Sequence, residues 1–102
     1  MPLISIVVPC YNEQESLPIF LKELDGVVRI MNQQDLGISF EAVLIDDGSA
    51  DKTLAVMKAE AAAAHPYAIR WHSFSRNFGK EAALLAGLQH AKGDYVATMD
   101  AD

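Results

Sequence analysis

The chain has 102 residues, enough for one compact domain of modest size. Its composition, 51% hydrophobic and 22% charged, is that of a soluble globular protein. A formal net charge of −6 excludes a sequence-independent grip on the phosphates of nucleic acids. No apolar run approaches the roughly 20 residues of a membrane-spanning helix, and the single cysteine, Cys10, excludes an internal disulfide.

The first two elements are predicted from their hydrophobic patterns. Leu3 to Val8 is a mostly β-branched run, which predicts a strand covered on both faces and ended by Pro9. From Leu17 onward, apolar residues recur at steps of three and four, which predicts an amphipathic helix. The residues that form its apolar face are Leu17, Phe20, Leu21, Leu24, Val27, Val28 and Met31.

Strands and helices alternate through the rest of the chain. We predict strands over 40–45, 69–74 and 95–99, and helices over 53–64 and 81–91. Between the second strand and its helix, "DDGSAD" is a turn in which Gly48 takes a positive φ and Ser49 or Asp51 caps the helix. This alternation over short connections predicts an α/β fold, with a Rossmann-like, mostly parallel sheet and flanking helices.

Polar side chains follow every predicted strand. Ligands of open parallel sheets bind beyond the carboxyl ends of the strands, so these residues are expected to gather at one edge. In chain order they are Pro9, Tyr11, Asn12 and Glu13, then Asp46 and Asp47, then Arg76 and Asn77, and finally Asp100 and Asp102. The strand bodies are apolar, and this asymmetry predicts a binding site.

The segment "MDAD" at residues 99–102 places two carboxylates two residues apart on an extended segment, so they point the same way. Unpaired carboxylates repel each other, and a divalent cation such as Mg²⁺ or Mn²⁺ removes that repulsion. An isolated Asp-x-Asp is more often a solvated turn. Because Asp100 and Asp102 follow the fourth of four polar strand ends, we favour the metal site.

Two further segments offer groups for a nucleotide. In "IDDGSAD", helix capping accounts for Ser49 and Asp51 but not for both Asp46 and Asp47, and a carboxylate there suits a base N–H or ribose hydroxyl. In "SRNFGK", Arg76, Lys80 and free backbone N–H groups at a helix start suit a phosphate or a base carbonyl, although the basic residues, Lys80 above all, also suit a surface loop that balances nearby acids. The dinucleotide fingerprint G-x-G-x-x-G is absent.

With these motifs in view, the chain resembles the N-terminal half of a family 2 glycosyltransferase of GT-A fold. It is most similar to the polyprenyl-phosphate sugar transferases, such as dolichol-phosphate mannose synthases and bactoprenol glucosyltransferases. The segments that carry the resemblance run in order from residue 5 to residue 102: "SIVVPCYNEQESL", "FEAVLIDDGSADKTL", "SRNFGKEAALLAGLQHAKGDYV" and "MDAD". Four motifs in register are far more specific than any one of them.

The resemblance implies roles for individual residues. Pro9, Tyr11 and Glu13 would line a nucleotide pocket, and Asp47, with Asp46 near it, would contact the base or ribose. Arg76 matches a basic position near the nucleotide. Asp100 and Asp102 match the carboxylates that hold the Mg²⁺ or Mn²⁺ bridging the diphosphate of a nucleotide sugar.

The resemblance also implies a reaction, an inverting transfer of sugar from a UDP- or GDP-linked donor to a polyprenyl phosphate at the cytoplasmic face of a membrane. Residues 1–102 correspond to the donor-binding part alone, and the acceptor pocket and catalytic residue are expected beyond residue 102. We therefore expect a soluble, donor-binding part of a longer cell-envelope enzyme, without transferase activity of its own. An uncovered sheet edge would favour self-association as a homodimer.

A receiver-type signalling domain is the main alternative, because it too carries aspartates at strand ends and binds Mg²⁺. Its acidic pair follows the first strand and its phosphorylated aspartate follows the third. Here the first strand leads into "PCYNE" and the third into "FSRN", so the pattern fails at both places.

Overall fold

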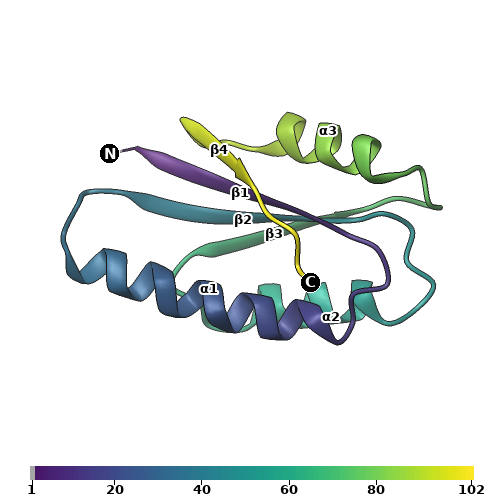
Figure 1. Ribbon diagram of the computed structural model, residues 1–102, viewed down its shortest axis with the longest axis horizontal. Coiled ribbons are helices and arrows are strands. Elements are labelled where there is room, and N and C mark those ends of the chain that lie inside the picture. Colours follow the sequence, from purple (N-terminus) through teal and green to yellow (C-terminus); the bar gives the residue numbers. More distant parts are fainter. Residues whose placement is uncertain (1) are drawn as a thin grey trace.

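The structure is a computed structural model that describes residues 2–102 as one sheet with helices on both faces (Figure 1). The elements in chain order are β1 (Leu3–Cys10), α1 (Ser16–Gln33), β2 (Ser39–Asp46), α2 (Thr53–Ala62), β3 (Ala68–Ser73), α3 (Lys80–His90) and β4 (Tyr95–Thr98). The predicted elements are all present, with boundaries that differ by a few residues. Within residues 2–102, no helix has the length and hydrophobicity to cross a bilayer.

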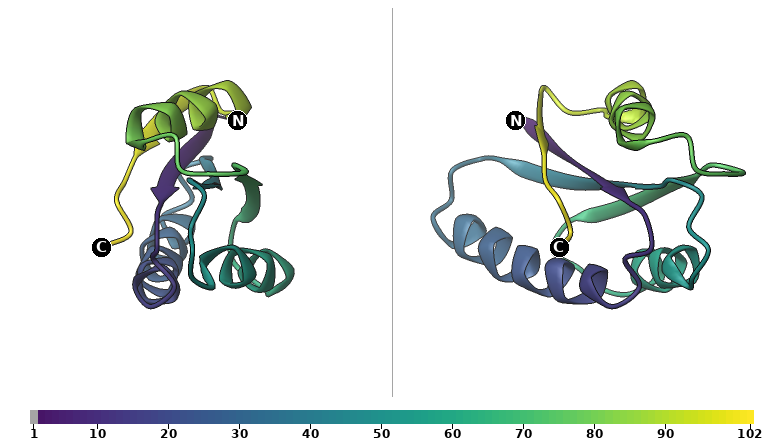
Figure 2. Two further views of the ribbon diagram at one scale, coloured as in Figure 1. Left: turned by 90° about the vertical axis from the view of Figure 1, so that its right-hand side faces the viewer. Right: turned by 45° about the vertical axis from the view of Figure 1, so that its right-hand side comes forward.

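The four strands are parallel and lie in the order β3-β2-β1-β4, which confirms the predicted α/β fold. Helices α1 and α2 cover one face, and α3 covers the other (Figure 2). Right-handed crossovers explain this, because the chain moves outward from β1 to β3 and then crosses back to place β4 on the far side of β1. A receiver domain instead has its third strand beside the first. The topology therefore excludes that alternative.

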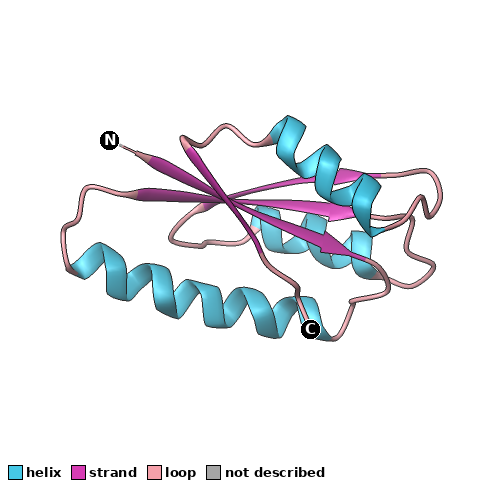
Figure 3. Cartoon of the chain, turned by 45° about the horizontal axis from the view of Figure 1, so that its top comes forward, coloured by secondary structure: helices cyan, strands magenta, loops and turns pink. Residues whose placement is uncertain are grey.

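The core has two layers, one on each side of the sheet. They lie between the strands and the helices drawn in Figure 3. Alternate residues of the central strands supply both, since Val8 of β1 points toward α1 and α2 while Val7 points toward α3. The fully buried side chains of the larger layer include Val8, Leu17, Leu21, Val28, Leu44 and Met57. Burial of both faces explains why β1 and β2 read as continuous apolar runs in the sequence.

The prediction that Pro9 ends the first strand is wrong, because β1 continues to Cys10 and Pro9 pairs with Ile45 of β2. The backbone of Cys10 faces β2, since its carbonyl accepts the Asp47 N–H, and the Val7 carbonyl faces β4. Peptide groups alternate in direction along a strand, so Pro9 faces the β4 side. Pairing with β4 has already ended at Val7. The missing N–H of proline therefore costs no ladder hydrogen bond there.

One residue of the predicted apolar face of α1 lies outside the core. Val27 is 54% exposed, whereas Leu24 and Val28 are buried. The buried apolar positions follow steps of four, three and four from Leu17, and Val27 lies about 100° away from its neighbour Val28 around the helix. The inward stripe is therefore narrower than the sequence pattern predicted.

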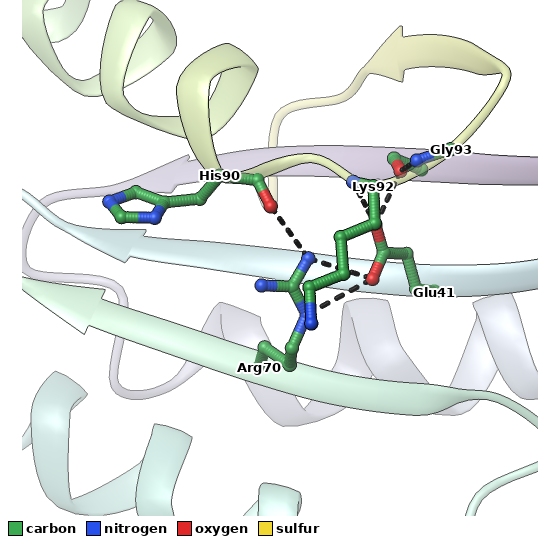
Figure 4. Close-up of polar contacts among 6 residues, drawn as sticks. Glu41, Arg70, His90, Lys92 and Gly93 are labelled. Carbon is green, nitrogen blue, oxygen red and sulfur yellow. Dashed lines mark hydrogen bonds and ion pairs between the residues drawn. The ribbon is translucent and has the colours of Figure 1, made fainter.

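A buried carboxylate ties the amino-terminal end of the sheet together (Figure 4). Glu41 on β2 accepts hydrogen bonds from Ser5 Oγ on β1 and from the Arg70 guanidinium on β3, at 3.0 Å from Nε and 2.8 Å from Nη2. It also accepts the Lys92 N–H at 2.8 Å, and Arg70 donates to the His90 carbonyl at 2.7 Å. Three strands and the α3–β4 connection therefore meet at one side chain, which fixes where β4 begins.

Candidate functional site

A cavity opens at the point where the strand order reverses. The chain proceeds from β1 to β2 and β3 on one side, and β4 joins β1 on the other, so β1 is the switch point of the sheet. Open α/β sheets bind ligands beyond the carboxyl ends of the strands at this point. A cavity of about 300 Å³ lies there, lined by Pro9, Cys10, Tyr11, Glu13, Asp47, Lys80, Asp100 and Asp102.

Hydrogen bonds between two loops hold the β1 side of the cavity. Asn12, at φ 53°, donates its N–H to Ser49 Oγ at 2.9 Å, and its side-chain oxygen accepts the Ala50 N–H at 2.9 Å. The Glu13 N–H donates to Thr53 Oγ1 at 2.8 Å. The loops after β1 and β2 therefore support each other, and together they place Tyr11 and Glu13 at the cavity.

The turn after β2 has the predicted glycine geometry. Gly48 adopts φ 67°, and a Cβ built on it would lie 2.1 Å from the backbone carbon of Arg76, so only glycine fits there. Asp51 binds the start of α2, because its Oδ1 accepts the Thr53 N–H at 2.9 Å. Ser49 Oγ instead accepts the Asn12 N–H, so Ser49 binds the loop after β1.

The Asp47 carboxylate accepts three hydrogen bonds at the wall of the cavity. Its side chain is buried, and its Oδ1 accepts the N–H groups of Phe78 at 2.8 Å and Gly79 at 3.3 Å. Asn77 Nδ2 donates to its Oδ2 at 3.2 Å. These backbone N–H groups at the start of α3 are therefore occupied by Asp47, so they are not free to bind a phosphate as the sequence suggested.

Asp46 lies outside the cavity lining. Its Oδ1 accepts the Ser49 N–H at 3.0 Å and its Oδ2 accepts Ser73 Oγ at 2.9 Å, and the residue is buried. Arg76 also lies outside the lining, with its guanidinium 4.9 Å from the centre of the Phe78 ring. The structure therefore gathers Pro9, Tyr11, Glu13, Asp47, Asp100 and Asp102 in one cavity but does not bring Asp46 or Arg76 into it.

Asp100 and Asp102 meet the cavity from the segment after β4, which runs toward α1 (Figure 1). Lys80 Nζ lies 2.8 Å from Asp100 Oδ1. The cavity thus contains four carboxylates and one ammonium. No group of three or more His, Cys, Asp or Glu residues within residues 2–102 has the geometry of a complete metal site. A pair of oxygen donors fits a divalent cation whose remaining ligands are water and a substrate diphosphate.

The Cys10 thiol and the histidines take no part in this site's chemistry. Burial, followed by the nearby charges of Glu13, Asp46 and Asp102, raises the pKa of Cys10 to about 12, so the thiol stays protonated and is a poor nucleophile. His65 lies between Asp25 and Glu60, which links α1 to the end of α2. The His72 ring stacks on the His90 ring at 3.6 Å between centroids.

Lys80 is the cavity residue that the sequence analysis did not select. The sequence offers Lys80 beside Arg76 as a cation for a phosphate, but the surface-loop interpretation suits Lys80 and the resemblance favours Arg76. Lys80 begins α3, which follows β3 and leads to β4, so its position faces the switch point. Once the strand order is known, the first residue of the helix between β3 and β4 is expected at the cavity, and that residue is Lys80.

Comparison with known proteins identifies the family. The sequence profile of "Glycosyl transferase family 2" matches residues 5–102, nearly the whole chain. The chain belongs to glycosyl transferase family 2. Its curated relatives in this family include an undecaprenyl-phosphate 4-deoxy-4-formamido-L-arabinose transferase of Pseudomonas paraeruginosa, 42% identical over 98% of this chain and 28% of the relative. The enzyme of the same name from Sodalis glossinidius is 41% identical over 97% of this chain and 28% of its own length.

Solved structures share the fold of this chain. A mannosyltransferase from Pyrobaculum calidifontis, in complex with GDP-Man and Mn²⁺, superposes with a TM-score of 0.78 at 25% identity, over 99% of this chain and 28% of the mannosyltransferase. The S. aureus protein TarS has a TM-score of 0.75 at 23% identity, over 97% of this chain and 27% of TarS, which shows the shared fold. The chain spans 28% of the length of the curated relatives that it matches.

Proposed function

We propose that this chain binds the nucleotide-sugar donor of a transferase whose acceptor is a polyprenyl phosphate. The relatives at about 41% identity are named as undecaprenyl-phosphate sugar transferases. Residues 2–102 would supply the donor-binding part of the GT-A domain, and the acceptor pocket and catalytic residue would come from elsewhere in a longer protein. Because the acceptor is a membrane lipid, the transfer would occur at a membrane surface, on its cytoplasmic side.

The single observation that carries the proposal is the convergence of carboxylates from three strand ends on one cavity. The cavity lining has one positive side chain, Lys80, against four carboxylates, those of Glu13, Asp47, Asp100 and Asp102. The cavity by itself therefore repels an anion. A nucleoside diphosphate could bind here only with a counter-ion, since like charges at contact distance are strongly unfavourable. Asp100 and Asp102, on the segment after β4, are the two carboxylates that would hold a divalent cation, either Mg²⁺ or Mn²⁺, with its other positions open to phosphate.

The other lining residues have the chemistry to hold a nucleoside. Tyr11 is about half exposed at the rim, where its ring offers a flat surface to a base. A carboxylate has about four acceptor positions, and Asp47 uses three of them within the protein. The remaining position, on Oδ2, suits a ribose hydroxyl or a base N–H. Because Asp47 is already fixed by α3, it needs little reorganisation to bind.

The proposed reaction displaces a nucleoside diphosphate from the anomeric carbon, with inversion. When bound, the divalent cation supplies positive charge to the leaving diphosphate. Asp100 and Asp102 hold that charge in place, and Asp47 and Tyr11 orient the nucleoside. A phosphate acceptor is already ionised at neutral pH, so this part of the protein would need no general base.

Calorimetry of UDP and GDP binding, with and without Mn²⁺ or Mg²⁺, tests the proposed function. We expect one of the two nucleotides to bind only when the cation is present. Asp102→Asn, which removes one ligand charge, should weaken that binding about tenfold or more. Equal binding with and without metal, or no binding of either nucleotide, would contradict the proposal.

We also propose that the chain associates with itself through the β4 edge. Within residues 2–102, β4 pairs with β1 alone, and its residues Tyr95 and Val96 are 67% and 41% exposed. An open edge with apolar side chains can pair with a second copy. Light scattering over a concentration series should show mass rising toward a dimer, and Val96→Lys should lower it. A constant monomer mass would refute this proposal.

A further inference from the structure

Lys80 places a positive charge where the proposed cation would bind. It is the first residue of α3, and its Nζ contacts Asp100 Oδ1 at 2.8 Å. Asp102 lines the same cavity as both residues. The Lys80 and Asp100 side chains are 61% and 56% exposed, so water surrounds the pair and its partners can exchange.

We propose that Lys80 is an internal counter-ion of the Asp100–Asp102 pair that competes with the divalent cation and, once displaced, contacts the donor diphosphate. The inference rests on the proposed function, because it takes Asp100 and Asp102 as the cation ligands. An ammonium in contact with Asp100 and a divalent cation on the same carboxylate pair would lie only a few ångströms apart and repel each other. Lys80 must therefore move away from Asp100 when the cation binds.

The new position of Lys80 follows from the residues around it. Its backbone is fixed at the start of α3, because the N–H of Gly79 is held by Asp47 and the Gly79 carbonyl accepts the Ala83 N–H. Only the flexible side chain can move, so the ammonium stays at the cavity that the diphosphate would enter. A lysine there acts as a point charge on phosphate oxygens.

No other basic side chain among residues 2–102 is placed for this role. Arg76 lies over the Phe78 ring and outside the cavity lining. Lys58 lies over the Trp71 ring, on the α2 side of the sheet. Lys92 belongs to the connection before β4, at the opposite end of the strands. Lys80 is therefore the one lysine or arginine in the lining of the cavity.

The proposal predicts effects of opposite sign for two ligands of one variant. In Lys80→Met, Mn²⁺ alone should bind about three- to tenfold more tightly, because its competitor is gone. The Mn²⁺ complex of UDP or GDP, whichever the wild type binds, should bind about tenfold more weakly, because a phosphate contact is lost. Titrations followed by the electron paramagnetic resonance of free Mn²⁺ measure the first, and calorimetry at saturating Mn²⁺ measures the second.

Two control variants separate competition from other causes. Lys92→Met makes the same charge change at the far end of the sheet and should leave both affinities within about twofold. Lys80→Arg keeps the charge and should keep Mn²⁺ affinity near wild type. Unchanged or weaker Mn²⁺ binding in Lys80→Met would overturn the inference while the metal site stands. Absence of Mn²⁺ binding in the wild type would overturn the metal site as well.

Discussion

Among the residues at the cavity, Asp47 has the clearest structural role, in addition to the binding role that we propose for it. Its carboxylate binds the start of α3 through Phe78 and Gly79, and it also lines the cavity. Asp47→Asn removes the charge and replaces one acceptor by a donor. We expect a loss of about 1–3 kcal/mol in the free energy of unfolding, together with weaker nucleotide binding.

Urea unfolding monitored by circular dichroism measures this loss. Asp35→Asn is the matched control, because Asp35 is exposed in the loop after α1 and has a positive φ that asparagine tolerates. It should change the free energy of unfolding by less than about 0.5 kcal/mol. Equal stability of the two variants would refute the structural role of Asp47.

Glu41 gives the protein a pH dependence in the acid range. Burial alone would raise the pKa of its carboxyl, but hydrogen bonds from Ser5, the Lys92 N–H and Arg70 outweigh burial and hold the pKa below its usual 4.5. A depressed pKa means that the folded state favours the charged form. The stabilisation is therefore complete above pH 4.5 and is lost as pH falls below that value toward the folded-state pKa.

Glu41→Gln isolates this contribution. The variant should be less stable than wild type at pH 7 by about 1–3 kcal/mol, because Arg70 and the Lys92 N–H lose a charged acceptor. The difference should shrink as pH falls below 4.5, since protonation removes the same charge from the wild type. Urea unfolding from pH 7 to pH 3 measures it, and a constant difference across that range would contradict the account.

At the scale of elements, the packing of α3 on the sheet is close enough to require glycine. A Cβ built on Gly87 would lie 2.2 Å from Val7 Cγ1, whereas one built on Gly26 of α1 meets nothing within 4 Å. Both glycines are inside helices, so alanine gains helix propensity of up to about 1 kcal/mol at each. Only at Gly87 must the methyl group push α3 away from β1.

Gly26→Ala should therefore stabilise the protein by about 0.5–1 kcal/mol, and Gly87→Ala should destabilise it by about 1–3 kcal/mol. Thermal and urea unfolding of the pair provide the comparison, with each variant serving as the control for the other. A Gly87→Ala variant as stable as wild type would show that α3 does not pack on β1 as closely as the structure indicates.

Much of this element structure was predictable because the signals are local. The β-branched run at 3–8 and the three- and four-residue spacing after Leu17 each report burial within a few positions of themselves. The exposure of Val27 was not predictable in this way, because hydrophobicity alone does not separate a narrow inward stripe from a wide one. Pro9 was misassigned because its tolerance depends on where β4 stops pairing, nearly 90 residues along the chain.

At the scale of the whole molecule, strand order decides which predicted residues meet. The rule that parallel strands carry ligands beyond their carboxyl ends was enough to gather Glu13, Asp47, Asp100 and Asp102. The sequence does not reveal that β4 lies beside β1, so it could not show that the start of α3 faces the cavity. For that reason the sequence left Lys80 between a phosphate contact and a surface loop, and it did not predict that Asp47 binds the Phe78 and Gly79 N–H groups.

The central claim is that carboxylates from separate strands form one cation site at the switch point. Paramagnetic broadening by sub-stoichiometric Mn²⁺ in amide NMR spectra tests it most directly. We predict that the amides of Tyr11, Asp47 and Lys80 broaden first, those around Glu41 last, and that Asp100→Asn with Asp102→Asn abolishes the pattern. Broadening centred elsewhere, for example around Asp25, or broadening that survives the double substitution, would contradict the account.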